Sequence, residues 1–316
     1  MNSTIRLYFL SILFITSCTK PEKLVLENYV DTLTKDTWYD IDLNSNQKIT
    51  AIGGYVWSEG FALNSDLSLS HIKIDSISNK GLFDLCRTSS DELLTVGTDG
   101  YLYRKAHQEG DWQFYRLSHW NILMRIHEVK DNFFAFGGKS NEHGYVYKIN
   151  NTYQIDTTYF FPFEISDALI TDSLIVAFGW GNIMTSPIDS IAWTLLPNDG
   201  DFFASGIMMD DSSGIIIGYN GKMLKTIDGG KHWSNFSPKI THAGFNAFRA
   251  IVQFDNGELM ICGNDGKFWI SVDRGENWNY HRLSKNVDIY GSIKTAPSEY
   301  ILCGSEGLLV QIKTNI

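Results

Sequence analysis

The sequence contains little cysteine and little proline, and it has no hydrophobic run long enough to cross a membrane. Four Cys among 316 residues are too few for a domain held together by disulfides. Six Pro, with 43% hydrophobic and 20% charged residues, exclude a proline-rich or disordered chain. The longest apolar run, residues 7–15, is far shorter than the roughly 20 residues of a membrane-spanning helix. We therefore expect a globular protein.

Basic charge and metal-ligand motifs are also scarce. The formal net charge is −10, which argues against a nucleic-acid binder, because such proteins hold phosphates with basic groups. The eight His are scattered, with no His-x-x-x-His or Cys-x-x-Cys pair, so we expect no metal. We also expect no cofactor, since the glycine turns connect strands and offer no helix N-terminus for a phosphate. Aromatic residues, at 14%, and 27 Gly are abundant, a mixture typical of short strands and turns.

The first residues have the pattern of an export signal. The apolar run is followed by Ile15-Thr16-Ser17-Cys18, which resembles the lipobox of bacterial lipoproteins. The resemblance implies that residues 1–17 are a signal peptide, that Cys18 carries acyl chains such as palmitate, and that residues 18–22 form a lipidated linker. The protein would then be anchored to a membrane of the bacterial cell envelope, outside the cytoplasm, facing the periplasm or the surface. An ordinary signal peptide beside a chance Cys is the alternative.

A short apolar strand ending in glycine recurs along the chain. The seven repeat glycines are Gly53, Gly97, Gly137, Gly179, Gly218, Gly263 and Gly304. They are spaced 44, 40, 42, 39, 45 and 41 residues apart, so seven copies fill nearly all of the chain after residue 22. The residue before each glycine is apolar, which predicts a core position. These residues are Ile52, Val96, Phe136, Phe178, Ile217, Cys262 and Cys303.

Each copy has the pattern of four strands. In one copy, strands are expected at 248–254, 258–262, 267–271 and 278–283, separated by turn residues. Asn-Gly and Asp-Gly pairs in these turns favour the positive φ that tight hairpins need. Four antiparallel strands in roughly 40 residues, repeated seven times, predict an all-β fold, a seven-bladed β-propeller.

The two ends of the chain are expected to share one blade. The last copy, which starts at residue 289, supplies three strands and lacks a fourth. Residues 23–29 precede the first inner strand, 38–43, and belong to no other copy. We expect this N-terminal strand to close the last blade, so that no blade edge at the junction is unpaired. Residues 23–316 would then form a single propeller domain.

Two copies carry a sharper motif between their third and fourth strands. The sequences are Thr226-Ile-Asp228-Gly-Gly230-Lys-His-Trp233 and Ser271-Val-Asp273-Arg-Gly275-Glu-Asn-Trp278. Both resemble the Asp-box, or BNR repeat, Ser/Thr-x-Asp-x-Gly-x-x-Trp. The longer context from Gly218 onward is similar to the repeat of photosystem II stability/assembly-factor-like propellers. The resemblance is strong over residues 202–283 and weaker elsewhere.

This resemblance implies seven blades, no catalysis and protein partners. It implies that the box is a structural turn, in which the Asp accepts bonds from the turn and the Trp packs between blades. The motif is degraded in the second copy, where Glu109-Gly110-Asp111-Trp112 has no Asp at the box position. In the fourth copy only Trp193 survives. Such losses are expected of a turn that neighbouring packing can replace.

Asp-boxes also occur in sialidases, so a sialidase-like glycoside hydrolase is an alternative. The arginine-containing motif that precedes the first box in that family is absent here. Arg87, Arg125 and Arg249 lie on expected inner strands, from which their side chains would reach the central channel. They form either a patch that grips an anion or separate pairs with strand carboxylates such as Asp84 and Asp167.

The second-to-third-strand hairpins and the blade connections share one face of a propeller, which we call the hairpin face. Aromatic and histidine side chains on this face are candidate binding residues, unless each packs on a neighbouring loop. The candidates are Trp57, Trp120, Trp180, Tyr219 and His143, together with the three channel arginines. We expect a monomeric, non-catalytic scaffold that docks a protein or an envelope component. A glycan-binding surface lipoprotein is the alternative, and no membrane contact beyond the lipid anchor is expected.

Overall fold

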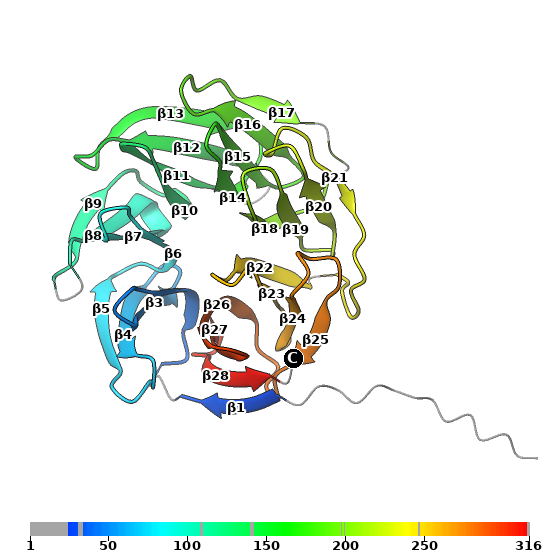
Figure 1. Cartoon of the computed structure of the whole chain (residues 1–316). Helices are drawn as coiled ribbons and strands as arrows, with labels where there is room; N and C mark the ends of the chain where they lie inside the picture. The colour runs from blue at the N-terminus through cyan, green and yellow to red at the C-terminus, as the bar shows by residue number, and fades with distance from the viewer. Residues whose placement is uncertain are drawn as a thin grey trace, which may run out of the picture.

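Seven four-stranded antiparallel sheets surround a central axis in a computed structural model of the chain (Figure 1). The structure describes residues 25–30, 34–107, 110–139, 142–196, 198, 200–245 and 247–314. The predicted all-β, seven-bladed propeller with four antiparallel strands per blade is confirmed. The predicted signal peptide, residues 1–17, the lipidation site Cys18 and the linker 18–22 lie outside the described residues.

Blades 1 to 4 follow one another along the chain, each from its inner to its outer strand. Blade 1 consists of β2 (Thr37–Leu43), β3 (Lys48–Tyr55), β4 (Glu59–Asp66) and β5 (Lys73–Ser78). Blade 2 consists of β6 (Leu82–Arg87), β7 (Leu93–Gly97), the 3-10 turn η1 (Thr98–Gly100), β8 (Tyr101–Lys105) and β9 (Gln113–Arg116). Blade 3 consists of β10 (Ile122–Val129), β11 (Asn132–Lys139), β12 (His143–Ile149) and β13 (Ile155–Phe161). Blade 4 consists of β14 (Ile165–Ile170), β15 (Leu174–Gly179), β16 (Ile183–Pro187) and β17 (Thr194–Leu196).

Blades 5 and 6 carry the two Asp-boxes and have the same order. Blade 5 consists of β18 (Phe203–Met208), β19 (Gly214–Gly218), β20 (Met223–Thr226) and β21 (Ser234–Phe236). Blade 6 consists of β22 (Phe248–Gln253), β23 (Leu259–Gly263), β24 (Lys267–Ser271) and β25 (Asn279–Arg282). The strands predicted for this copy agree with β22 to β25 within one residue at every end.

Blade 7 joins the two ends of the described chain. Its inner strands β26 (Ile289–Ala296), β27 (Glu299–Gly304) and β28 (Leu309–Thr314) are followed in the sheet by β1 (Val25–Tyr29). The register runs from Val25 opposite Thr314 to Tyr29 opposite Val310, and Figure 1 shows the blue β1 beside the red β28. The prediction that the N-terminal strand closes the last blade is confirmed, and the outer edge of β28 is thereby covered.

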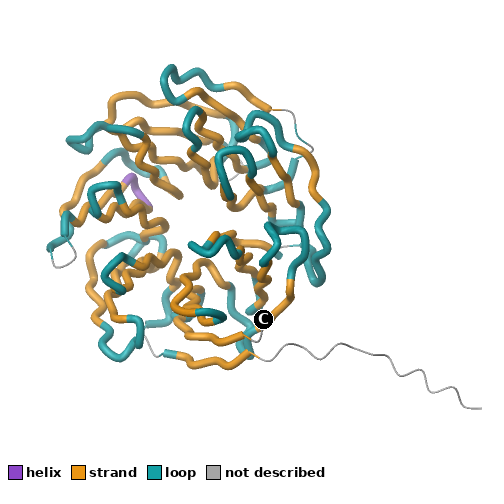
Figure 2. The backbone as a smooth tube through the Cα atoms, in the orientation of Figure 1, coloured by secondary structure: helices purple, strands orange, loops and turns teal. Residues whose placement is uncertain are grey.

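The core lies between neighbouring blades. All seven residues that precede the repeat glycines have exposures of 0%, so the core position predicted from the repeat is confirmed. Each core cluster joins two sheets; one of them packs Ile215 and Ile217 of blade 5 against Leu259 and Ile261 of blade 6. Strands thus form the ring, while loops gather at its two faces and its outer rim (Figure 2). Because the side chains between blades are buried in the core, a functional site must be formed by those loops and by the inner strands that border the axis.

Candidate functional site

All seven inner strands contain a β-bulge at the same step of their pairing with the second strand. The register shifts lie between Trp38/Asp40, Leu82/Asp84, Leu123/Arg125, Ile165/Asp167, Phe203/Ser205, Phe248/Ala250 and Ile289/Gly291. A bulge leaves one residue unpaired and re-aims its side chain. The seven bulge residues are Tyr39, Phe83, Met124, Ser166, Ala204, Arg249 and Tyr290. All seven line a single cavity at one mouth of the channel.

This cavity, the upper vestibule, has a volume of about 340 Å³. It lies on the hairpin face, because Val56, Gly138 and Tyr219 of the second-to-third-strand hairpins also line it. The bulge residues are large in blades 6, 7, 1, 2 and 3, whereas blades 4 and 5 contribute only Ser166 and Ala204.

A continuous run of aromatic rings borders the vestibule. Ring centroids lie 5.3 Å apart for Trp180–Phe202, 4.8 Å for Phe202–Tyr219, 5.4 Å for Tyr290–Tyr39 and 4.8 Å for Tyr39–Phe83. Arg249 bridges the gap, with its guanidinium carbon 4.7 Å from the Tyr219 ring and 5.5 Å from the Tyr290 ring. We call these seven residues the aromatic arc. It runs from blade 4 through blades 5, 6, 7 and 1 to blade 2. All of its members except Trp180 line the vestibule, and the arc presents a large, stiff apolar surface at the channel mouth.

Arg249 is held within the arc by several acceptors. Its Nε donates to Oδ1 of Asn264 at 2.6 Å, its Nη2 donates to Oδ2 of Asp288 at 2.8 Å, and its Nη1 donates to the Tyr219 hydroxyl. Burial would lower the pKa of Arg249, but Tyr219, Tyr290 and Asp288 outweigh it and raise the pKa. The guanidinium is thus a charged, satisfied part of the wall.

Below the vestibule, the residues after the bulges in blades 1 to 4 form a charged ring. These residues are Asp40, Asp84, Arg125 and Asp167, and with His127 they line a lower cavity of about 440 Å³. Nε of Arg125 lies 3.3 Å from Oδ1 of Asp167 and 3.7 Å from Oδ1 of Asp84. Arg125 is therefore paired with the two strand carboxylates that the sequence suggested.

The carboxyl groups of the charged ring have unequal pKa values. Burial and the neighbouring Asp84 raise the pKa of Asp40 to about 7. Burial also raises the pKa of Asp84, and Arg125 opposes this only in part. For Asp167, burial is outweighed by Arg125 and His127, which lower the pKa. The ring therefore holds more carboxyl groups than its one guanidinium can stabilise as anions.

Arg87 lies apart from the other two channel arginines. Its Nε donates to Oδ2 of Asp42 at 3.1 Å, and its Nη1 donates to Oδ1 of Asp91 at 2.7 Å. It lines neither the vestibule nor the lower cavity. Of the two arrangements left open by the sequence, the separate pairs are observed, and a converging arginine trio of the sialidase kind is not formed by these residues.

The hairpin face brings together two tryptophans from different blades. Trp57, in the hairpin of blade 1, and Trp120, before blade 3, have ring centroids 6.3 Å apart. They are 43% and 80% exposed. Nζ of Lys80 donates to the backbone oxygen of Trp57 at 2.9 Å and fixes that hairpin. His143 also lies on this face, at the start of β12, with its ring 6.0 Å from Tyr145.

Trp120 has an unusual backbone for so large a residue. Its φ is 65°, in the left-handed region that side chains other than glycine rarely adopt. Oδ1 of Asp99 accepts the Trp120 N–H at 2.6 Å, and Arg116 donates to the other carboxylate oxygen. Burial opposes ionisation of Asp99, but these two donors outweigh it and lower the pKa. The loop thus keeps Trp120 in an unfavourable backbone conformation with its indole ring exposed to solvent. This arrangement favours a binding role for Trp120.

In both Asp-boxes the predicted residues gather within one turn. In blade 6, the Ser271 hydroxyl donates to Asp273 at 2.9 Å, and Asp273 accepts the backbone N–H of Asn277 at 2.9 Å. Nε1 of Trp278 donates to the Gly275 carbonyl at 2.8 Å, and the ring packs between blades 5 and 6. Blade 5 repeats this arrangement with Thr226, Asp228, Gly230 and Trp233. The carboxylates of Asp228 and Asp273 thus accept hydrogen bonds from their own turns on the outer rim.

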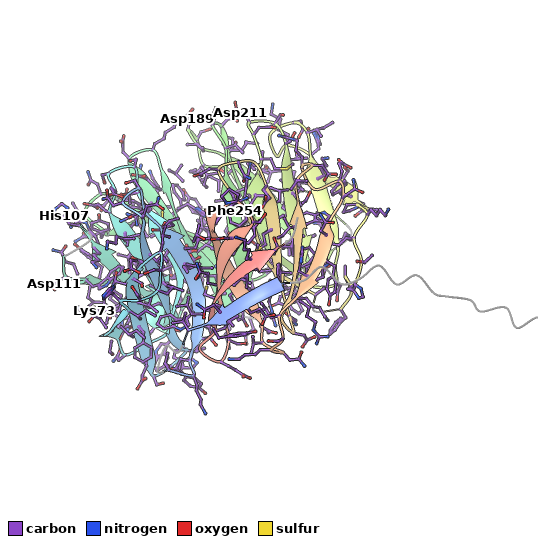
Figure 3. All side chains as sticks on the ribbon, turned by 60° about the horizontal axis from the view of Figure 1, so that its bottom comes forward. Lys73, His107, Asp111, Asp189, Asp211 and Phe254 are labelled. Carbon is purple, nitrogen blue, oxygen red and sulfur yellow. The ribbon has the colours of Figure 1, made fainter. Side chains whose placement is uncertain are left out.

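Loss of the box in blade 2 leaves a groove against blade 1. A β-carbon on Gly230 or Gly275 would touch the preceding blade, at Val176 and Ile215, whereas one on Gly110 would meet only His107 of its own turn. A groove of about 630 Å³ opens there, lined by Lys73 of blade 1 and Asp111 of blade 2 among others. Both residues project from the same side of the ring in Figure 3.

Four of the seven residues of the aromatic arc were not predicted from the sequence. Tyr39, Phe83, Phe202 and Tyr290 were not among the candidates, although they line the vestibule. One signal is visible afterwards, since an aromatic-Asp pair occurs on the first two inner strands, at Tyr39-Asp40 and Phe83-Asp84. Without knowledge of the bulges, strand alternation does not tell which member of each pair faces the channel.

The described ranges contain neither a metal-binding cluster nor a membrane-spanning helix. Across residues 25–314, apart from the short gaps given above, no group of three or more His, Cys, Asp or Glu side chains is placed to hold a metal ion. In the same part of the chain, no helix is both long and apolar enough to span a bilayer.

Comparison with known proteins agrees with the Asp-box repeat. Residues 190–294 match the family described as Photosynthesis system II assembly factor YCF48. The matched segment contains both Asp-boxes. The predicted resemblance is thereby confirmed: the chain is similar to this family of seven-bladed propellers. No curated protein matches the sequence.

Solved structures share the fold over nearly the whole chain. "YCF48 bound to D1 peptide" has 14% identity and a TM-score of 0.69, covering 92% of this chain and 97% of that one. "YCF48 from Cyanidioschyzon merolae" has 11% identity and a TM-score of 0.69, covering 91% and 98%. A catalytically inactive virginiamycin B lyase from Staphylococcus aureus with quinupristin has 12% identity and a TM-score of 0.72, covering 92% and 99%. At such identities the likeness concerns the fold alone.

Proposed function

We propose that this protein is a non-catalytic scaffold, lipid-anchored outside the cytoplasm, whose hairpin face docks a segment of a partner protein. The aromatic arc carries the proposal, because stiff aromatic side chains around a cavity bury much surface for little lost entropy. The exposed Trp120, held in a strained backbone, adds to it. The structure titled "YCF48 bound to D1 peptide" is a precedent for a peptide ligand on this fold.

The place where the chain enters the propeller supports an arrangement in which the hairpin face points away from the membrane. Val25 pairs with Thr314 at the end of β28, whereas the β27–β28 hairpin lies at the other end of that strand. An anchor at Cys18 would therefore leave from the face opposite the hairpin face. Seven Cα steps from Cys18 to Val25 span at most about 25 Å. The vestibule would then face the aqueous compartment of the cell envelope and remain open to a partner.

The anchor is tested by replacing the proposed acylation site. Cells that express the full chain with Cys18→Ser should show no palmitate label on the protein, and it should leave the membrane fraction. The wild-type chain, fractionated in parallel, should carry the label. A Cys18→Ser chain that is still labelled and still membrane-bound would contradict the lipoprotein assignment without affecting the docking proposal.

The docking face is tested by affinity capture with the intact lipidated protein from its own membrane. The variant Trp57→Ala/Trp120→Ala should lose a partner that wild type retains. Phe160→Ala is the matched control, because Phe160 is 74% exposed but lies on β13, an outer strand. A partner kept by the double variant and lost from the Phe160 variant would place docking on the rim and refute the proposal.

A glycan-binding lipoprotein is the second candidate, favoured by the exposed Trp57–Trp120 pair. Tryptophan faces are also suited to stacking on sugar rings. Binding of the mature protein to a glycan array, lost in Trp120→Ala, would select this candidate. A glycoside hydrolase is the remaining alternative, and turnover of sialyl substrates that is lost in Arg125→Ala would select it over both.

A further inference from the structure

The upper vestibule is lined mainly by apolar and aromatic side chains, which make up nine of its fourteen lining residues. Four of them, Val56, Ile122, Met124 and Phe202, are only partly buried. These four belong to none of the core clusters that the described residues form between blades. Core packing therefore does not account for this apolar surface. A concave apolar surface that the core does not use is typical of a binding site.

The charged groups of the vestibule wall have partners within the chain. Nη2 of Arg249 donates to Oδ2 of Asp288 at 2.8 Å, and Nε of Arg125 lies 3.3 Å from Oδ1 of Asp167. Glu164, the remaining charged residue of the wall, also interacts within the chain. A charged ligand group would lose its hydration on entry and would find no free counter-charge in this wall.

Two hydroxyl groups of the wall are engaged as well. The Ser166 hydroxyl donates to the Phe178 carbonyl at 3.1 Å and also to the Phe203 carbonyl. The Tyr219 hydroxyl accepts a hydrogen bond from Arg249. An apolar ligand group can enter without breaking these bonds, and it would remove the surrounding rings from water. The wall therefore favours an uncharged, apolar ligand group.

The vestibule adjoins the two exposed tryptophans of the hairpin face. Val56 directly precedes Trp57 in the hairpin of blade 1, and Ile122 follows Trp120 by two residues at the start of β10. The two indole rings lie 6.3 Å apart, and both Val56 and Ile122 line the vestibule. A partner segment that lies across the tryptophans would thus bring a neighbouring side chain to the mouth of the vestibule.

We propose that the upper vestibule receives one large, uncharged apolar side chain, such as phenylalanine, from a partner segment that crosses the Trp57–Trp120 pair. This inference rests on the proposed docking function and names the chemistry of its central contact. The volume of about 340 Å³ is at the low end for ligand pockets, which suits a single side chain. The rings of Tyr39, Phe83 and Tyr290 favour an aromatic occupant, because aromatic pairs attract beyond the area that they bury.

The experiment uses the mature full-length chain and blocked peptides of one design, acetyl-Gly-Gly-X-Gly-Gly-amide. X is phenylalanine, norleucine, lysine or alanine, so that norleucine keeps the alkyl chain of lysine without its charge. Calorimetric titration should give at least tenfold tighter binding for the phenylalanine peptide than for the alanine peptide. The norleucine peptide should bind more tightly than the lysine peptide. Added salt should not reduce the preference for phenylalanine, since the attraction is not electrostatic.

Ala204→Leu tests the cavity by filling it. Ala204 is 8% exposed and is one of the two small bulge residues of the vestibule. The larger side chain should remove most of the tenfold preference for phenylalanine. Ala192→Leu is the matched control, because Ala192 is exposed in the β16–β17 loop and does not line the vestibule. Thermal melts check that both variants are folded.

Phe202→Ala tests the wall without overfilling it. Loss of this ring should weaken binding of the phenylalanine peptide several-fold and leave binding of the alanine peptide unchanged. Phe245→Ala is the matched control, because Phe245 is 82% exposed in the connection between β21 and β22 and does not line the vestibule. This pair decides the question even where Ala204→Leu does not fold.

Three outcomes would overturn the proposal. Equal binding of the phenylalanine and alanine peptides, or tighter binding of lysine than of norleucine, would refute the apolar occupant but leave a peptide-docking function standing. A preference for phenylalanine that survives Phe202→Ala and is lost in Phe245→Ala would place the contact outside the vestibule. Binding of none of the peptides would refute the pocket, whereas the docking function would be judged separately by capture with the Trp57→Ala/Trp120→Ala variant.

Discussion

The carboxylate of Asp84 accepts the backbone N–H of Ile126 at 2.8 Å, although the two residues lie on inner strands of different blades. Asp40 makes the equivalent bond to Leu85 at 2.8 Å, one blade earlier. An inner strand pairs with the second strand of its blade on one edge, and it has no further strand to satisfy the edge that faces the channel. Aspartates on neighbouring strands supply the missing acceptors in the first three blades and tie those blades together at the axis.

Asp84→Ala should therefore lower the free energy of unfolding by about 1–3 kcal/mol, the cost of leaving a buried N–H without an acceptor. Asp84→Asn should cost less, because an amide oxygen still accepts this bond. Urea unfolding of both variants at pH 7 measures the difference. If alanine and asparagine were equally tolerated, the bond would have no measurable role in joining blades 2 and 3.

Asp40 predicts a pH dependence of stability. Its pKa is raised by burial and by Asp84, from 3.8 to about 7. A carboxyl whose pKa is higher in the folded state stabilises the protein at low pH and loses this contribution as it ionises. The free energy of unfolding should therefore fall as the pH rises from about 4 to about 7. In Asp40→Asn this fall should be reduced, as followed by thermal melts across the range. An unchanged pH profile in the variant would show that another group is responsible.

The glycine of the Asp-box predicts a stability difference between two similar substitutions. Gly275 has φ 86°, and a β-carbon there would come 2.7 Å from Cδ1 of Ile215. Gly257 has φ 79° with no heavy atom within 4 Å of the same position. Gly257→Ala should cost about 1–2 kcal/mol through its left-handed backbone. Gly275→Ala should cost about 1–3 kcal/mol more through the clash with blade 5. Equal costs in denaturant titrations would indicate that the clash is relieved by repacking.

Trp120 predicts a variant that loses binding without losing stability. Its left-handed backbone costs roughly 1–3 kcal/mol, and its ring is 80% exposed, so little packing is lost on truncation. Trp120→Gly should leave the melting temperature unchanged or raise it, while partner capture on the hairpin face is lost. A large drop in the melting temperature would instead assign Trp120 to packing within its loop.

The shared blade predicts that the N-terminal strand is needed for stability and solubility. Besides the β1–β28 ladder, Glu27 accepts bonds from the Ser284 N–H at 2.9 Å and the Ser284 hydroxyl at 2.6 Å. A chain that starts at residue 31 should melt at a lower temperature and associate through the bared edge of β28. Light scattering together with thermal melts checks both effects. A truncated chain that stays monomeric and equally stable would show that the clasp is dispensable.

Much of the fold could be predicted because its determinants are local. The glycine repeat and the apolar residue before each glycine depend on strand and turn preferences within one blade. Cys262 and Cys303, for instance, could be assigned to the core from their place in the repeat, and both are fully buried. The closing strand could be predicted by counting strands.

The binding surface was decided by the tertiary structure. Whether Tyr39 or Asp40 faces the vestibule depends on a bulge, and one residue of register reverses every side chain in a strand. Arg87 and Arg125 both lie on inner strands, yet they have different partners, and Asp42 for Arg87 and Asp167 for Arg125 come from neighbouring blades. The sequence by itself determined the blades, their number and their closure. Only the closed ring brought Tyr219, Arg249 and Phe83 around one cavity, since distances between blades are set by the ring and not by any segment within it.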